Sequence, residues 1–251
     1  MKTQLPVTLV IPTYNRTDKT NNLLESLAEA DFSCEIILVD DHSTEEIEKL
    51  AQSFEEILQV RYVRNEKNMG PAYSRNIGIG LATNPYIAFT DNDCIVTKDW
   101  LIRLYEYIRD APSNIAGVGG RTVALSSDMI SQYYEYNKIL DPWFHNGKWL
   151  YIVSANSIFK KVVLEKVSGF DEEVKKAGGE DVGLCFKIHN EGYDLLYNDD
   201  AVILHDFDTG FLKFWKTFFT YGYGSRVQYD KFYHSTGSQK QINFAGLPGD
   251  T

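Results

Sequence analysis

Residues 86–93 read Tyr-Ile-Ala-Phe-Thr-Asp-Asn-Asp, an apolar strand that ends in two carboxylates one residue apart. Alternation along a strand sends neighbouring side chains to opposite faces, but at the strand's end Asp91 and Asp93 can turn toward one point. Two hard oxygen donors suit Mg²⁺ or Mn²⁺, which fills its other coordination sites with phosphate oxygens and water. The stretch therefore predicts a site for a metal-bound diphosphate. A polar turn after a buried strand is the alternative, because Asp and Asn favour turns.

Length, composition and charge narrow the class of protein. The chain has 251 residues, of which 43% are hydrophobic and 24% charged, as in an ordinary soluble globular protein. Its formal net charge is −10 and it has no run rich in Lys or Arg, which argues against nucleic acid as the main partner. The start of the chain lacks the long apolar region of a signal peptide, and no apolar run is long enough to cross a bilayer. We therefore expect a cytoplasmic protein.

The three cysteines, Cys34, Cys94 and Cys185, are far apart and match no metal-ligand spacing. We expect reduced, buried thiols.

Short apolar runs alternate with amphipathic stretches through the first hundred residues. Strands are expected at residues 7–11, 35–39, 60–64 and 86–90, and helices at residues 18–30, 44–58 and 71–82. This alternation predicts βαβ units and a mostly parallel sheet. Ligands of such sheets lie beyond the carboxyl ends of the strands, so the segments that follow the strands are the candidate binding loops.

The second half of the chain is less regular. A strand pair is expected within residues 115–123, further strands at 151–153 and 201–204, and helices at 127–140 and 180–191. The mixed pattern predicts an α/β fold in which a second half-domain shares the sheet. We expect one domain over residues 1–240, with a nucleotide-binding half at about 5–110, an acceptor-side half at about 111–240, and a tail at 241–251.

The segment Pro12-Thr13-Tyr14-Asn15-Arg16 follows the first strand. A dinucleotide-binding protein would carry a glycine fingerprint here, and this chain does not. Instead, Tyr14 could pack on a nucleobase and Arg16 could reach a phosphate. Asp41, at the end of the second strand, could accept a hydrogen bond from a base imino group or a ribose hydroxyl. A helix cap is an equally open role for Asp41.

Two further segments offer polar groups at the same edge. Asn68-Met69-Gly70-Pro71 has the glycine and proline of a helix start, and Arg75 lies one turn into that helix, facing either the pocket or solvent. Gly178-Gly179-Glu180-Asp181 opens a later helix, where acidic residues either favour the helix dipole or include a general base.

His205 ends an apolar strand. An ordinary hydrogen-bonded histidine is the commoner reading of such a position. Downstream of a metal motif, it is expected to be a third ligand, because imidazole is acceptable to Mn²⁺.

The order of these motifs resembles the family 2 glycosyltransferases of the GT-A fold. The resemblance runs over residues 5–230 and rests on Val-Ile-Pro-Thr-Tyr-Asn-Arg, Leu-Val-Asp-Asp-His-Ser, Asn-Met-Gly-Pro-Ala-Tyr-Ser-Arg-Asn, Asp-Asn-Asp, Gly-Gly-Glu-Asp and Leu-His-Asp. It implies a GT-A-like single domain with a Rossmann-like nucleotide-binding half and a mixed central sheet. Asn92, between the two acids, stands where many members have Asp or Ala, a tolerant position.

The resemblance also implies roles for residues. Asp91, Asp93 and His205 would hold Mn²⁺ or Mg²⁺ in a D-x-D-type metal site, and Asp181 would be the catalytic base. The expected substrate-binding residues are Pro12, Thr13, Tyr14, Arg16, Asp41, Asn68, Gly70, Arg75, Asp91, Asn92, Glu180 and Arg226. Of these, Thr13, Tyr14 and Asp41 would contact the base, and Arg226, from a late glycine–arginine motif, a phosphate.

Two aromatic groups have open roles. Phe211, Phe214, Trp215, Phe218 and Phe219 recur at helical spacing with lysines between them, which predicts core packing or, as the second interpretation, peripheral contact with a membrane. An aromatic cluster expected in a loop, made of Trp143, Phe144, His145 and Trp149, predicts either a wall for a sugar acceptor or a loop anchor.

These observations together predict a metal-dependent glycosyltransferase in polysaccharide or glycoconjugate biosynthesis. It would move a sugar from a nucleotide-diphosphate sugar, by resemblance a UDP-sugar, to a hydroxyl on a glycan, a lipid-linked sugar or another glycoconjugate. No residue stands out as a nucleophile for a covalent intermediate, which favours inversion. The alternatives are a sugar-phosphate nucleotidylyltransferase, which would release pyrophosphate, and a non-catalytic nucleotide-sugar-binding relative. If the acceptor is lipid-linked, the protein would work at the inner face of the membrane.

Overall fold

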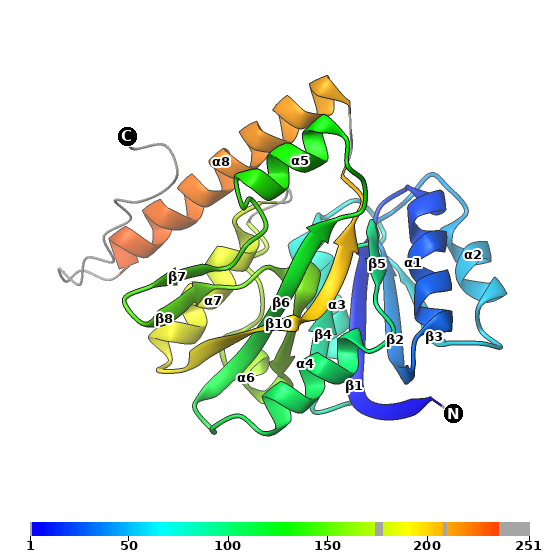
Figure 1. The fold of residues 1–251 in the computed structure, drawn as a ribbon, viewed down its shortest axis with the longest axis horizontal. Helices are drawn as coiled ribbons and strands as arrows, with labels where there is room; N and C mark the ends of the chain where they lie inside the picture. The colour runs from blue at the N-terminus through cyan, green and yellow to red at the C-terminus, as the bar shows by residue number, and fades with distance from the viewer. Residues whose placement is uncertain (1, 174–177, 208–209, 236–251) are drawn as a thin grey trace.

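One mixed sheet of eight strands runs through the molecule in the order β3-β2-β1-β4-β9-β6-β10-β5 (Figure 1). The computed structural model describes residues 2–173, 178–207 and 210–235. The expected tail at 241–251 lies outside these residues. The α/β class with a mixed central sheet is confirmed.

The first half of the chain folds as the alternating pattern predicts. Its elements are β1 (Thr3–Thr13), α1 (Thr17–Glu29), β2 (Phe32–Asp40), α2 (Ile47–Ser53), β3 (Gln59–Arg64), α3 (Pro71–Leu81) and β4 (Tyr86–Phe89). Strands β3, β2, β1 and β4 are parallel, so their carboxyl ends meet at one edge. Helix α2 is shorter than the expected 44–58 at both ends, since it begins at Ile47 and ends at Ser53.

The second half extends the same sheet. It contains β5 (Cys94–Val96), α4 (Trp100–Arg109), β6 (Ile115–Ala124), α5 (Met129–Tyr136), β7 (Trp143–His145), β8 (Lys148–Tyr151), η1 (Ser154–Asn156), β9 (Ser157–Lys160), α6 (Lys161–Lys166), α7 (Glu180–Asn190), β10 (Asp194–His205) and α8 (Phe211–Ser235). Strand β9 is antiparallel to both β4 and β6, β10 is parallel to β6, and β5 is antiparallel to β10.

The strand pair expected around the glycines of residues 115–123 is wrong, because this stretch is the single strand β6. Its glycines serve close packing instead of a turn. A Cβ on Gly117 would lie 2.4 Å from the ring of Phe159, and a Cβ on Gly120 would lie 2.4 Å from the Ala201 carbonyl oxygen. Glycine within a strand marks such a close approach as readily as a bend.

The aromatic cluster is a hairpin and not the expected loop. Strands β7 and β8 pair antiparallel, joined by Asn146 and Gly147 with φ angles of 48° and 79°. Asn-Gly is the pair that favours a two-residue hairpin turn with two positive φ angles. Strand β8 ends at Tyr151, so the strand expected at 151–153 lies earlier in the chain than predicted.

Helices cover both faces of the sheet. Apolar residues of α1, α2 and α4 form one core cluster with one face of the sheet, and those of α3, α6 and α7 form another with the opposite face. Alternation along β1 divides its side chains in the same way, since Leu9 and Ile11 join the first cluster and Val10 the second. The three cysteines are buried and unbridged, as predicted.

Helices α5 and α8 lie side by side at the end of the sheet toward which β6 and β10 point (Figure 1). Within the described residues, no helix combines the length and hydropathy that crossing a membrane requires.

Candidate active site

The pairing of β5 with β10 brings Asp93 and His205 together. The two strands are antiparallel with His205 opposite Cys94, and the backbone N–H of Asp206 donates to the carbonyl oxygen of Asp93, 2.8 Å away. The His205 Nε2 atom then lies 3.5 Å from Oδ1 of Asp93. Residues separated by more than a hundred positions therefore meet because each sits at a strand terminus on the carboxyl edge of the sheet.

Asp93, Cys94 and His205 have ligand atoms that all lie within 4.8 Å of one another. Burial, with a smaller contribution from the charges of Asp93 and Asp91, raises the pKa of the Cys94 thiol well above its usual value. The His205 Nδ1 atom is buried without a hydrogen-bond partner. A carboxylate oxygen and an imidazole nitrogen fit Mn²⁺, whereas a thiol would not be its ligand of choice.

Asp91 has another partner. Its Oδ1 atom accepts a hydrogen bond from Nη2 of Arg75 at 2.7 Å, and Nη1 of Arg75 lies 3.1 Å from Oε1 of Glu180. Arg75 also packs over the ring of Phe170, 5.4 Å from its centroid. The solvent-facing alternative for Arg75 is therefore wrong: only 3% of its side chain is exposed.

This buried arginine keeps its charge. Burial alone would lower its pKa, but the carboxylates of Asp91, Glu180 and Asp181 outweigh burial and hold the pKa above the ordinary value. Arg75 thus joins the Asp-Asn-Asp segment to the Glu-Asp segment, from opposite halves of the chain. A metal role for Asp91 stays a prediction.

Arg16 lies against Asp93. Its Nη1 atom is 2.5 Å from Oδ2 of Asp93. Asn15 and Arg16 have φ angles of 55° and 62°, a left-handed conformation that few residues other than glycine adopt. The side chain of Asn15 holds the turn by accepting from Thr44, and its backbone N–H donates to Oγ of Ser43 at 2.7 Å. The loop after β1 is thereby shaped to direct a guanidinium at the carboxylate of Asp93.

Thr13 and Asn92 are buried partners of each other. The Asn92 amide donates to Oγ1 of Thr13 at 2.9 Å and to Oγ1 of Thr20 at 3.1 Å. The amide thus fixes the Asp-Asn-Asp turn to the end of β1. Tyr14, in contrast, is 49% exposed, next to Pro12 and Thr13 at the same edge. A direct contact of these residues with a nucleotide stays a prediction.

Asp41 organises the loop before α3. Its carboxylate accepts hydrogen bonds from the backbone N–H groups of Met69 and Gly70 and from the amide of Asn65, each at 2.8 Å. Asp41 therefore does not cap the following helix, the alternative left open from the sequence. The neighbouring Asp40 accepts from the backbone N–H of Ser43 at 2.8 Å, before α2 begins at Ile47.

Gly70 has a φ of 92°, which suits glycine, and precedes Pro71 at the first position of α3. Asn68 is exposed in the same loop. Binding of substrate by either residue stays a prediction.

Asp181 lies in the first turn of α7, beside Glu180. Burial, and next the negative charge of Glu180, raise its pKa to about 7, although Arg75 and a hydrogen bond with Ser154 act in the other direction. Its Oδ1 atom is buried without a hydrogen-bond partner. A carboxyl group that titrates near neutral pH and keeps a free oxygen is suited to exchange a proton with a ligand.

No pattern in the sequence indicates the contact between α8 and the segment before Asp181. Gly178 and Gly179 have φ angles of 124° and 90°. A Cβ on Gly224 of α8 would lie 1.7 Å from the carbonyl oxygen of Gly178, so the helix and the loop touch through backbone. Tyr221 of α8 is also close, because a Cβ on Gly178 would lie 2.9 Å from its Cα atom. Burial, and next the charges of Tyr134 and Asp91, raise the pKa of Tyr221. Arg226, expected to bind phosphate, is exposed on α8.

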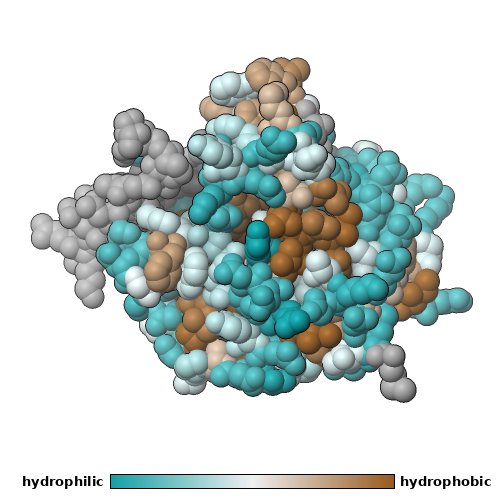
Figure 2. All heavy atoms as spheres, viewed as in Figure 1, coloured by the Kyte–Doolittle hydropathy of each residue, from teal (hydrophilic) through white to brown (hydrophobic). Residues whose placement is uncertain are grey.

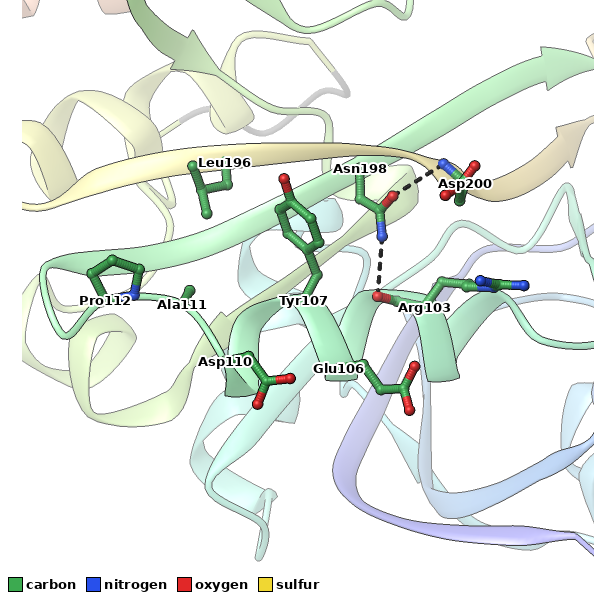
Figure 3. A pocket seen from close by; sticks show the side chains of 9 residues that line it. All are labelled: Arg103, Glu106, Tyr107, Asp110, Ala111, Pro112, Leu196, Asn198 and Asp200. Carbon is green, nitrogen blue, oxygen red and sulfur yellow. Dashed lines mark hydrogen bonds between the residues drawn. The ribbon is translucent and has the colours of Figure 1, made fainter.

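A hollow lies elsewhere in the described structure (Figure 3). It has a volume of about 470 Å³ and lies between the carboxyl end of α4 and the early part of β10, where Tyr107 stands between Leu196 and Asn198. No predicted site residue lines it. Its place at the amino-terminal part of β10, away from His205 at the other end, separates it from the site described above.

Comparison with known proteins gives a family. The model of glycosyl transferase family 2 matches residues 8–168. A "Pre-mycofactocin glycosyltransferase" of Mycobacterium tuberculosis is 29% identical over 212 residues, covering 81% of this chain and 43% of the relative. A "Glucosyl-dolichyl phosphate glucuronosyltransferase" of Haloferax volcanii is 27% identical over 270 residues, covering 97% and 83% of the two chains. The chain thus spans less than half the length of the first of these relatives.

Solved structures give the fold. The crystal structure of TarS from S. aureus superposes with a TM-score of 0.65 at 21% identity, over 82% of this chain and 37% of that one. The mannosyltransferase PcManGT of Pyrobaculum calidifontis, in complex with GDP-Man and Mn²⁺, superposes with a TM-score of 0.64 at 20% identity, over 84% and 59% of the two chains. The GT-A fold expected from the resemblance is confirmed. Since the family model covers most of the chain, including the loop after β1, the Asp41 loop and the Asp-Asn-Asp turn, the protein belongs to glycosyl transferase family 2.

Proposed function

We propose that the protein transfers a sugar, with inversion, from a nucleotide-diphosphate sugar to a hydroxyl acceptor in a metal-dependent reaction. The observation that carries the proposal is the joining of the Asp-Asn-Asp segment and the Glu-Asp segment through one buried arginine, Arg75. The proposed metal ligands and the proposed general base would then lie at the same edge of the sheet, which is where α/β proteins bind their ligands.

Asp93 and His205 would hold Mn²⁺ or Mg²⁺, with Asp91 nearby. The ion, when bound, would neutralise the charge that develops on the departing diphosphate. Arg16 and Arg75 add fixed positive charge around these acids, which helps an acidic protein accept a phosphorylated ligand.

The donor is proposed to be a UDP-sugar. TarS has been solved with UDP-GlcNAc at 22% identity to this chain, and PcManGT with GDP-Man and Mn²⁺. Tyr14 would stack on the base, and Asp41, with the loop that contains Asn68 and Gly70, would shape the wall beside it.

Asp181 is proposed as the general base. It would take the proton of the acceptor hydroxyl while that oxygen forms a bond to the anomeric carbon and the bond from this carbon to the diphosphate breaks. A single displacement of this kind inverts the anomeric centre. The raised pKa of Asp181 supports the assignment, because a stronger base accepts a proton more readily.

The acceptor is proposed to be a glycan or a lipid-linked sugar, used at the cytoplasmic face of a membrane. The match to a relative named for a dolichyl phosphate substrate over 97% of this chain favours the lipid-linked alternative.

Incubation with a panel of nucleotide sugars, with and without Mn²⁺, tests the proposal. We expect free nucleoside diphosphate as the product, first by slow hydrolysis and faster with a suitable acceptor. Release of pyrophosphate from a sugar phosphate and a nucleoside triphosphate would identify a nucleotidylyltransferase instead. Binding of nucleotide sugar with no turnover across acceptors would identify a non-catalytic relative.

A further inference from the structure

Helix α8 exposes an apolar face. Five large apolar side chains lie on it, each at least 60% exposed: Phe211 66%, Leu212 86%, Trp215 60%, Phe219 77% and Tyr223 65%. At 3.6 residues per turn they occupy an arc of roughly 120° around the helix axis. Figure 2 shows apolar residues gathered at the end of the molecule where Figure 1 places the start of α8.

The opposite side of α8 already supplies the packing that the fold needs. Phe214 and Phe218 meet Tyr133 of α5 edge to face, with ring centroids 5.3 and 5.7 Å apart. Gly224 touches the Gly178 carbonyl, and Gln228 donates to Asp171 at 3.1 Å. The expectation that the whole aromatic stripe is core is therefore wrong for Phe211, Trp215 and Phe219. Their exposure calls for another explanation.

The neighbouring helix α5 enlarges the apolar surface. Met129 and Tyr136 are 81% and 88% exposed, and Tyr133, which packs on Phe214, is still 44% exposed. We call the exposed apolar residues of these two helices the α5–α8 face: Met129, Tyr133, Tyr136, Phe211, Leu212, Trp215, Phe219 and Tyr223.

The charge around this face is unlike that of the whole protein. Residues 210–229 contain Lys213, Lys216 and Arg226 and no Asp or Glu, in a chain whose formal net charge is −10. All three basic side chains are exposed. Helix α5 adds the exposed Glu135 and its N-cap Asp128, so three basic and two acidic residues give the two helices together a net charge of +1 over these residues. The face stays positive beside exposed Trp and Phe and is complementary to a surface that is negative outside and apolar within.

We propose that the α5–α8 face docks the protein on the surface of an anionic lipid bilayer, a specific form of the membrane contact in the proposed function, on which it rests. Helices with Trp, Phe and Leu on one face and Lys beside it lie in the plane of the bilayer interface. Lysines near that plane are attracted to anionic headgroups by about 1 kcal/mol each. A second copy of this chain would cover the apolar residues but would bring the same positive charge against itself.

Docking would also serve the candidate site. The inner side of α8 touches the Gly178–Gly179 turn that precedes Asp181: a Cβ on Gly178 would lie 2.9 Å from Cα of Tyr221, and one on Gly224 would lie 1.7 Å from the Gly178 carbonyl oxygen. The helix that meets the bilayer is thus the helix that borders the site. An acceptor hydroxyl carried on a lipid would reach Asp181 from the bilayer side.

Co-sedimentation of the full chain with vesicles tests the proposal and needs no catalytic turnover. We expect binding to vesicles of phosphatidylcholine mixed with phosphatidylglycerol, and much weaker binding to phosphatidylcholine alone. The double variant Trp215→Ser/Phe219→Ser should lose binding to both. Each of Lys213→Gln and Lys216→Gln should weaken binding to the anionic vesicles about fivefold, the factor that corresponds to about 1 kcal/mol.

Tyr107→Ser is the matched control, because Tyr107 is an exposed aromatic residue, 45% exposed, on α4. It should bind vesicles as the wild type does. Equal binding by wild type and Trp215→Ser/Phe219→Ser, or no binding to anionic vesicles, would overturn the proposal. The proposal would also be overturned if the wild type did not bind vesicles and instead formed a concentration-dependent dimer that this double variant abolishes. Nucleotide-sugar turnover measured in parallel without vesicles reports on the proposed function separately.

Discussion

Arg16 donates a hydrogen bond to Asp93 at 2.5 Å, and it does so from a left-handed backbone conformation with a φ of 62°. The other oxygen of Asp93 faces His205 at 3.5 Å. The carboxylate thus lies between a fixed positive charge and an imidazole. A divalent cation and Arg16 must therefore share or compete for the carboxylate of Asp93. Arg16 is then expected to weaken the binding of the metal alone and to strengthen the binding of the nucleotide.

Arg16→Gln should bind Mn²⁺ alone more tightly than the wild type, because a competing cation is removed. The gain should be up to about fivefold, the range of a partly exposed ion pair. The same variant should bind nucleoside diphosphate in the presence of Mn²⁺ more weakly, because a phosphate-directed charge is lost. Isothermal titration calorimetry measures both. Arg103→Gln, which removes an exposed pair with Asp99, is the control. If Arg16→Gln changed the affinities for Mn²⁺ and for the nucleotide in the same direction, competition between Arg16 and the metal would be refuted.

Arg75→Met should destabilise the fold strongly. Arg75 and Glu180 are nearly fully buried, with 3% and 5% of their side chains exposed, so loss of the arginine leaves a buried carboxylate without its partner. Breaking a buried pair in this way costs about 3–5 kcal/mol. Urea unfolding gives the value. Arg103→Met should change the free energy of unfolding by no more than about 1 kcal/mol, because its pair with Asp99 is half exposed; a similarly small effect for Arg75→Met would show that the bridge adds little stability.

Gly224→Ala should be damaging although it lies in a helix. The added Cβ would be 1.7 Å from the carbonyl oxygen of Gly178, so α8 must move away from the loop before Asp181. We expect a lower melting temperature together with a lower turnover number. Gly222→Ala is a matched control two residues away, with no atom within 4 Å of its Cβ, and it should gain up to about 1 kcal/mol from helix propensity. If Gly224→Ala matched Gly222→Ala, close contact between helix and loop would be disproved.

The pH dependence of kcat/KM should show an acidic limb set by Asp181. Burial and the charge of Glu180 raise its pKa to about 7, and only the deprotonated form accepts a proton. Activity should therefore rise with pH through about 7 and then level off. In Asp181→Asn the limb should disappear along with a factor of about 10²–10⁴ in turnover, the usual contribution of a general base, while donor affinity stays the same. Wild-type turnover in this variant would remove Asp181 from the mechanism.

Local sequence pattern was enough to predict the first half of the fold. Strands β1, β2 and β4 are apolar runs closed by a polar turn, β3 alternates apolar and polar residues, and the helices between them have an apolar stripe, so propensity and burial agree. The glycines of β6 were misread because the signal for a turn and the signal for close packing are the same residue. Gly117 differs from a turn glycine only through Phe159, which lies 42 positions away in the chain.

The candidate site shows a similar division. Motif order points to Asp91, Asp93, Asp181 and His205 because each follows a strand or opens a helix. The partners of these residues depend on tertiary structure. Nothing near Arg75 in the sequence indicates Glu180, and nothing near Gly178 indicates Gly224. The hairpin turn at Asn146 and Gly147, in contrast, is a local signal that sequence reasoning overlooked.

The binding of nucleoside diphosphate measured with and without Mn²⁺, in the wild type and in Asp93→Ala, tests the central claim most directly. Wild-type protein should bind the nucleotide much more tightly with Mn²⁺ present. Asp93→Ala, shown to be folded by circular dichroism, should bind it equally weakly in both conditions. A metal-dependent gain in Asp93→Ala as large as that of the wild type would contradict the account.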